Sequence, residues 1–236
     1  MKTLNETLIG NLCLELFSDR LQYLVELLNT NIKPLKRADG DNVNIRAMYV
    51  VNDQINLHGG RLDAVEIERL AALLIDTPVL IGHDRARPPL ARTFHAEIET
   101  ANGQVWLKSY FYWPKPENGA DELLLNIDSG LYKECSISFA YAMPACSHCG
   151  EDIRRCRHEI DPQAAAGDSS NVHFLYKDIT QVFETSLVYK GAVRGTYITD
   201  KLLGDSRGLD EMSLIFRNQV HRLMPVKRNG EIGDAD

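Results

Sequence analysis

The sequence predicts an α+β fold, built as one β-rich domain that carries an insert. Its length of 236 residues suits one good core, and 44% apolar with 25% charged residues is ordinary globular composition. Strand-forming segments gather in the middle of the chain, whereas helical spacing dominates near both ends. We therefore expect an N-terminal helical segment over residues 1–40, a main domain over 41–200 with an insert at 146–171, and a C-terminal helix with a flexible tail over 201–236.

Helices are expected at four places, over residues 4–28, after Asp63, over 120–130 and over 212–220. The first has leucines at near-helical spacing with acidic and amide residues between them. Asp63 and Glu66 form a capping-box pattern ahead of an apolar face, and Pro78 ends that helix. Gly130 is the expected stop of the third helix.

Strand-forming composition marks six segments, namely residues 44–53, 78–84, 92–103, 104–113, 131–143 and 174–192. The dipeptide Asn102–Gly103 predicts a hairpin turn between two of them. The segment at 131–143 reads as a buried strand. A polar stretch rich in cysteine, alanine, glycine and serine separates the last two segments, so we interpret it as an insert between core strands.

Charge and hydropathy exclude several classes of protein. The formal net charge is −7, without the basic stripe typical of nucleic-acid binders, so no direct contact with nucleic acid is expected. Glu6, Glu15 and Asp19 interrupt the apolar residues of the N-terminus, which does not fit a signal peptide. No apolar run approaches the ~18 residues of a membrane span. We expect a cytoplasmic chain without membrane contact.

Two serines lie in the segment KECSISFAY. Side chains alternate along a strand, so Ser136 and Ser138 share one face. They could be half-buried serines that satisfy local hydrogen bonds. A nucleophilic role needs a histidine base supplied by the fold. The possible bases are His58, His83, His95 and His173. His83 is the preferred candidate because it closes the short apolar strand PVLIGHD, where a catalytic side chain can be aimed.

Three cysteines and a histidine follow at metal-ligand spacing. Cys146 and Cys149 form a C-x-x-C pair, and Cys156 and His158 follow. Tetrahedral zinc prefers such thiolate and imidazole ligands, and four protein ligands make a closed, structural site. The alternative is a set of free or redox-active thiols. Because one residue between Cys156 and His158 is a short spacing, two other histidines stay open as the fourth ligand, namely His148 and His173.

Three segments together resemble the prohead, or capsid maturation, serine proteases of tailed phages. They are PVLIGHD followed by PPLART, then DSGLYKECSISFAY, and finally QVFETSLVYKGA. Their order matches the family, and the resemblance covers roughly residues 45–200. It implies a fold similar to the herpesvirus assemblins, a closed and mainly antiparallel β-barrel flanked by helices. A cysteine knuckle after the serine strand is also found in some members of the family.

The resemblance implies a role for each matched residue. His83 would be the general base, Ser136 the nucleophile and Glu184 the acid that orients the histidine. Arg194, in GAVRG, would serve the oxyanion hole, since the assemblins use an arginine there. Asp84 is the rival of Glu184, although neighbouring side chains on an extended segment diverge, and Glu184 could instead be a solvated strand residue.

Two positions depart from the family pattern. Ser138 and Ala91 stand where the family has glycine, and a glycine near a nucleophile allows close backbone approach. A chain that keeps the fold but cleaves poorly or not at all therefore remains an alternative.

The resemblance also implies a function and partners. The chain would be a serine endopeptidase that cleaves the scaffold or delta segment of the major capsid protein, and its own chain, inside the procapsid in the host cytoplasm. No cofactor would serve catalysis beside the structural zinc. Dimerisation activates the assemblins, which makes a homo-oligomer one expected state. Two other functions stay open: a catalytically inactive capsid-assembly or scaffold protein, and a zinc-dependent protein-binding module.

Overall fold

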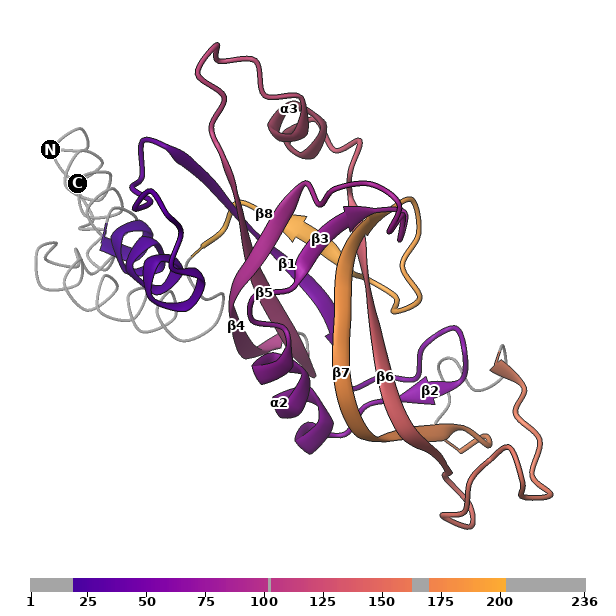
Figure 1. Ribbon diagram of the computed structural model, residues 1–236. Coiled ribbons are helices and arrows are strands. Elements are labelled where there is room, and N and C mark those ends of the chain that lie inside the picture. Colours follow the sequence, from indigo (N-terminus) through magenta and orange to yellow (C-terminus); the bar gives the residue numbers. More distant parts are fainter. Residues whose placement is uncertain (1–18, 102, 163–169, 203–236) are drawn as a thin grey trace, which may run out of the picture. The chain divides into compact units, whose positions relative to one another are not determined.

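The computed structural model describes residues 19–101, 103–162 and 170–202 (Figure 1). Its elements in chain order, after a helix over residues 19–32, are β1 (Val43–Asn52), β2 (Gly60–Arg61), α2 (Ala64–Leu73), β3 (Pro78–Ile81), β4 (Ala91–Ala101), β5 (Gln104–Pro114), α3 (Glu122–Asp128), β6 (Glu134–Cys146), β7 (Phe174–Val188) and β8 (Tyr197–Thr199). The helix expected over 212–220 and the tail lie outside the described residues.

Local sequence signals mark the start of α2 and the end of α3, whereas the first helix, expected over residues 4–28, continues to residue 32. Asp63 is the N-cap of α2, and its carboxylate accepts a hydrogen bond from the backbone N–H of Glu66 at 3.0 Å. Asp121 caps α3 in the same way through the N–H of Leu124. Gly130 follows α3 with a φ of 76°, a left-handed conformation that glycine adopts without strain. No helix of the described part is long and apolar enough to span a membrane.

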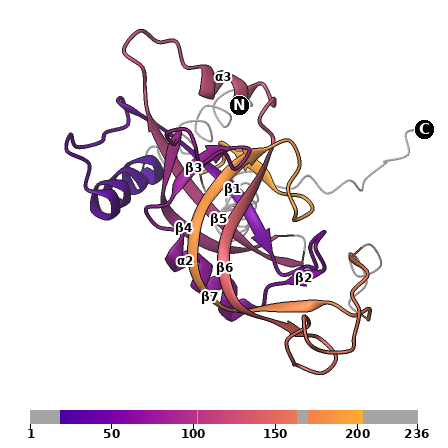
Figure 2. The same ribbon diagram turned by 45° about the vertical axis from the view of Figure 1, so that its right-hand side comes forward.

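The strands form one curled mixed sheet, a half-barrel, as Figures 1 and 2 show. The order is β2-β7-β3-β4-β5-β1-β8, and β6 pairs with the other side of β7. Most neighbours are antiparallel, but β7 runs parallel to both β2 and β3. The expected hairpin is present, with Ala101 opposite Gln104. The parallel pairs were not expected, and they make the sheet mixed.

The pairing of β3 with β7 is the long-range contact that matters most for the site. Leu80 lies opposite Ser186, and Ile81 lies opposite Leu187. Because the last residues of β3 pair with the middle of the segment QVFETSLVYKGA, the turn that follows β3 lies next to β7. Two sequence segments about a hundred residues apart are thereby brought side by side.

Two hydrophobic clusters hold the fold together. The larger one lies between the sheet and α2 and includes Ile67, Leu70 and Leu74, all fully buried. The smaller one joins the helix over residues 19–32 to the sheet through Leu24 and Leu28. Burying a leucine side chain stabilises the fold by about 1.5–3 kcal/mol, so both helices contribute to the core.

Strand β6 is less buried than the sequence suggested. Cys135 is fully buried and the last three residues are buried, but those between are half-buried or exposed. The expectation of a buried strand over 131–143 is therefore wrong for its middle part. Part of the reason is that residues 135–139 of β6 line an open cavity, as described next.

Candidate active site and metal centre

His83 lies in a turn two residues beyond the end of β3. The expectation that it would close the strand is wrong. Gly82 and His83 both have positive φ angles, 60° and 61°, a conformation that is uncommon for a non-glycine residue. The N–H of Gly82 donates to the carbonyl of Leu187 at 2.9 Å, which holds the turn against β7. The turn thus carries the imidazole over that strand.

His83 and Glu184 are in hydrogen-bond contact. Nδ1 of His83 lies 2.7 Å from Oε1 of Glu184. The carboxylate is 1% exposed, whereas the imidazole is 42% exposed, so Glu184 is not a solvated strand residue. A buried carboxylate at Nδ1 fixes the ring orientation and keeps the proton on that nitrogen, which leaves Nε2 available as a base.

Ser186, which the sequence did not single out, completes the support of this pair. Its hydroxyl donates to Oε2 of Glu184 at 2.7 Å and accepts from the backbone N–H of His83 at 3.0 Å. The residue is fully buried. The signal in the sequence was the E-x-S spacing, which puts Glu184 and Ser186 on the same face of one strand.

Ser136 and His83 line the same cavity, which has a volume of about 400 Å³. Ser136 lies opposite Ser186 in the β6–β7 ladder. Across the described part of the chain, no side-chain hydrogen bond joins Ser136 to His83. Catalytic hydrogen bonds of this kind often tighten only when substrate binds. The cavity therefore brings the predicted nucleophile and base to one space without linking them directly.

Arg85 and Ser138 occupy another part of the cavity lining. Nη2 of Arg85 donates to the hydroxyl of Ser138 at 2.9 Å, and its guanidinium lies 4.9 Å from the ring centre of Phe183. Among the described lining residues, none is acidic, and Arg85 is the one arginine. The hydroxyl of Ser138 is therefore the acceptor of a hydrogen bond from an arginine.

The other candidates of the sequence lie apart from this cluster. The carboxylate of Asp84 accepts from the N–H of Ala86 and pairs with Arg87, so it does not serve His83. Arg194 is exposed and is not among the cavity-lining residues, although Val193 is. Ala91 is a buried residue at the start of β4. Of the predicted site residues, the structure groups His83, Ser136 and Glu184.

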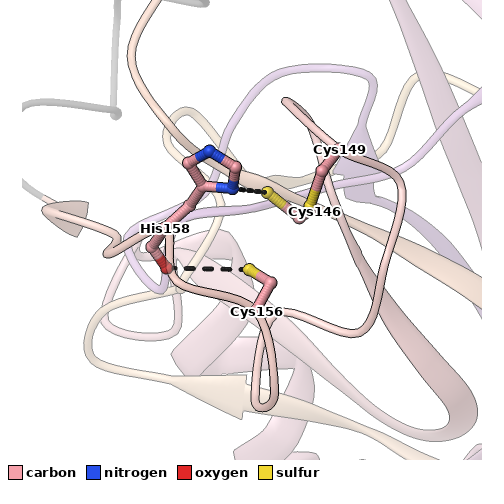
Figure 3. A group of neighbouring side chains, drawn as sticks. All are labelled: Cys146, Cys149, Cys156 and His158. Carbon is pink, nitrogen blue, oxygen red and sulfur yellow. Dashed lines mark hydrogen bonds between the residues drawn. The ribbon is translucent and has the colours of Figure 1, made fainter.

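The second candidate centre lies at the far end of β6. Sγ of Cys146, Cys149 and Cys156 and a ring nitrogen of His158 all lie within 4.8 Å of one another (Figure 3). Sγ of Cys146 is 3.6 Å from Nδ1 of His158. A tetrahedral ion with metal–sulfur and metal–nitrogen bonds of about 2.3 and 2.05 Å separates two such ligands by roughly 3.6 Å. The four side chains could therefore hold one metal ion such as zinc.

The histidine of this group is His158, one of the three that the sequence left open as the fourth ligand. The ring of His148 lies 5.4 Å from that of His158 but is outside the four. His173 is buried, and its Nδ1 faces the carbonyl of Asn171 at 3.0 Å. The short spacing between Cys156 and His158 thus does not prevent their side chains from meeting.

Backbone geometry supports the C-x-x-C turn. Gly150 has a φ of 76°, and its N–H donates to the carbonyl of Cys146 at 2.8 Å. Burial opposes ionisation of the Cys146 thiol, but hydrogen bonds from the backbone of Cys149 and His148 outweigh it and lower its pKa. A lowered thiol pKa favours the thiolate form that binds metals.

The insert is tied to the strands and to the cavity. Ser147 and His173 exchange hydrogen bonds across its base, through the Ser147 N–H and hydroxyl, at 2.9 and 3.1 Å. Ile160 packs so closely on Gly59 that a Cβ there would lie 2.6 Å from its methyl group. The neighbours of Gly59, His58 and Gly60, line the cavity. The insert therefore supports one wall of the candidate active site.

Comparison with models of known protein families finds no match, and no curated protein matches the chain.

Proposed function

We propose that this chain is a serine endopeptidase of the prohead maturation type, which cleaves scaffold or delta segments of a major capsid protein and its own chain inside the procapsid. The observation that carries the proposal is the hydrogen bond between Nδ1 of His83 and the buried carboxylate of Glu184, beside a cavity that Ser136 also lines. The resemblance of the three segments supplies the class of substrate.

The chemistry assigns one role to each group. Nε2 of His83 removes the proton of Ser136, whose oxygen attacks the peptide carbonyl and forms an acyl-enzyme. Glu184 stabilises the imidazolium that forms, and His83 then protonates the leaving amine. Water hydrolyses the acyl-enzyme with the same base. In this proposal the oxyanion is stabilised near the segment that follows β7, where Arg194 is the candidate from the resemblance.

The proposed fold is the closed barrel of the assemblins. Its support is the edge between β8 and β6, where the N–H of Ile198 donates to the carbonyl of Lys133 at 3.2 Å. The N–H of Cys135 also donates to the hydroxyl of Thr196 at 3.4 Å. These contacts join the two ends of the curled sheet without a regular strand pair in the described residues.

The direct test is co-expression with the major capsid protein that this chain is proposed to process. We expect the native chain to process the capsid protein and Ser136→Ala to leave it intact, whereas the matched control Ser138→Ala keeps processing. A fluorophosphonate should label Ser136 of the purified native chain, with the labelled residue found by mass spectrometry. Equal processing by the native chain and Ser136→Ala would reject the peptidase in favour of an inactive assembly protein.

For the cysteine cluster we propose a structural zinc ion with four protein ligands, held by Cys146, Cys149, Cys156 and His158. Four protein ligands leave no position for a reacting water, which favours a structural role. The insert is too short for a core of its own, so a metal would supply its stability. A purified chain with no metal, and with a melting temperature that chelators do not change, would contradict this part.

A further inference from the structure

Ser186 makes two hydrogen bonds that no other described residue near the site duplicates. Its hydroxyl donates to the Oε2 atom of Glu184 and accepts from the backbone N–H of His83. The side chain is fully buried, and the carboxylate it contacts is 1% exposed. One hydroxyl thus holds both partners of the His83–Glu184 hydrogen bond, Glu184 through its side chain and His83 through its backbone.

Each of the two bonds restrains a different part of the pair. Glu184 offers Oε1 to the imidazole, and the bond at Oε2 stops the carboxylate from rotating away. His83 has a backbone conformation that is strained for a residue with a Cβ, so its turn needs outside support. The parallel pairing of Leu80 with Ser186 brings the hydroxyl directly beneath this turn.

We propose that Ser186 is the positioning residue of the site: it holds the carboxylate of Glu184 and the backbone of His83 in the register that points Nε2 at the nucleophile. This inference rests on the proposed function, in which His83 is the base. Ser186 itself touches neither the substrate nor the reacting atoms. Its removal leaves the backbone N–H of His83 and the buried Oε2 atom of Glu184 without this partner, which loosens the pair.

The chain offers a matched control in the preceding residue. Thr185 is equally buried, and its hydroxyl is the one buried side-chain polar atom of the described residues that has no hydrogen-bond partner. Thr185→Val removes a buried hydroxyl of the same strand while keeping the shape of the side chain. Ser186→Ala removes one that makes two bonds. Ser186→Thr keeps the hydroxyl, and Ser186→Cys keeps the size.

The first measurement is the saturation kinetics of fluorophosphonate labelling at Ser136. We expect Ser186→Ala to lower the maximal labelling rate roughly 10- to 100-fold, the effect of one hydrogen bond to a charged group, with an unchanged half-saturating concentration. Ser186→Thr or, if that variant unfolds, Ser186→Cys should restore part of the rate, and Thr185→Val should match the native chain. Native-like labelling of Ser186→Ala would overturn the inference.

The second measurement does not depend on activity. In proton NMR, the proton on Nδ1 of His83 should give a far-downfield signal that is lost in Glu184→Gln. We expect this signal to broaden or vanish in Ser186→Ala and to persist in Thr185→Val. If the native chain is not labelled at all, the proposed function fails and this signal alone decides the positioning role. An unaltered signal in Ser186→Ala overturns that role in either case.

Discussion

Ser138 of β6 lies directly opposite Glu184 of β7. The ladder is irregular immediately beyond this pair, since Phe139 lies opposite Val182 and Phe183 is left over as a bulge. Arg85 covers the bulge, with its guanidinium over the ring of Phe183. The second serine of the strand is therefore next to the candidate carboxylate and is held by an arginine from the turn that carries His83.

The first prediction concerns this hydrogen bond of Arg85. Ser138→Gly removes the acceptor of this bond. The bond is exposed, so its removal should cost little stability. We expect a loss of about 1 kcal/mol in the free energy of unfolding, mostly because glycine is flexible in a strand. Fluorophosphonate labelling of Ser136 should stay within about tenfold of the native rate. Complete loss of labelling in a folded variant would make Ser138 part of the reacting machinery.

The second prediction tests the charge of Glu184. Glu184→Gln keeps the shape of the side chain but cannot stabilise an imidazolium, and its amide can hold the wrong tautomer of His83. By analogy with the corresponding change in serine proteases, kcat for capsid processing should fall roughly 10³- to 10⁴-fold. Asp84→Asn is the control, because that carboxylate binds Ala86 and Arg87 instead. Similar losses in both variants would contradict the assignment of Glu184.

The third prediction distinguishes His148 from His158, whose rings are close in space. His158→Ala removes a proposed ligand, so metal affinity should fall by more than the 10–100-fold typical of losing an outer-shell partner, and the melting temperature should drop. His148→Ala, whose ring lies 5.4 Å away, should keep its metal. Elemental analysis and thermal unfolding of both variants check this. Loss of metal from His148→Ala alone would exchange the two assignments.

The fourth prediction concerns acid stability at Glu97. Burial opposes its ionisation, but hydrogen bonds from His95, Arg20 and Tyr110 outweigh this and lower the pKa of Glu97 from 4.5 to about 2. A carboxyl with a lowered pKa in the folded state stabilises the protein above its unfolded pKa. This stability should be lost as the pH falls from about 4.5 to about 2.

Glu97→Gln checks this expectation through urea unfolding at several pH values. The variant should be less stable than the native chain at pH 7, with a smaller further loss between pH 5 and pH 2. Glu26→Gln is the control, since Glu26 and its partner Arg37 are both more than half exposed and an exposed ion pair contributes about 0–1 kcal/mol. Parallel pH profiles for the native chain and Glu97→Gln would contradict the prediction.

Local signals in the sequence predicted the elements well, because they act over a few residues. The cap at Asp63, the stop at Gly130 and the spacing of the cysteines each specify their surroundings without help from the rest of the chain. The parallel pairing of β3 with β7 has no such signal, since it joins residues about a hundred positions apart. The bonds of Ser186 depend on that pairing, which is why spacing alone did not reveal them.

The insert has a consequence for how the chain folds. Strands β6 and β7 share the longest ladder of the sheet, yet the 27 residues from 147 to 173 separate them. A metal bound between Cys146 and His158 would close part of this connection. The free segment between the metal site and β7 would then be about half as long. The entropic cost of closing the loop falls by only about 0.6 kcal/mol, but this cost must be met before the β6–β7 ladder forms. Metal bound during synthesis would then modestly speed the meeting of the two strands that carry the site.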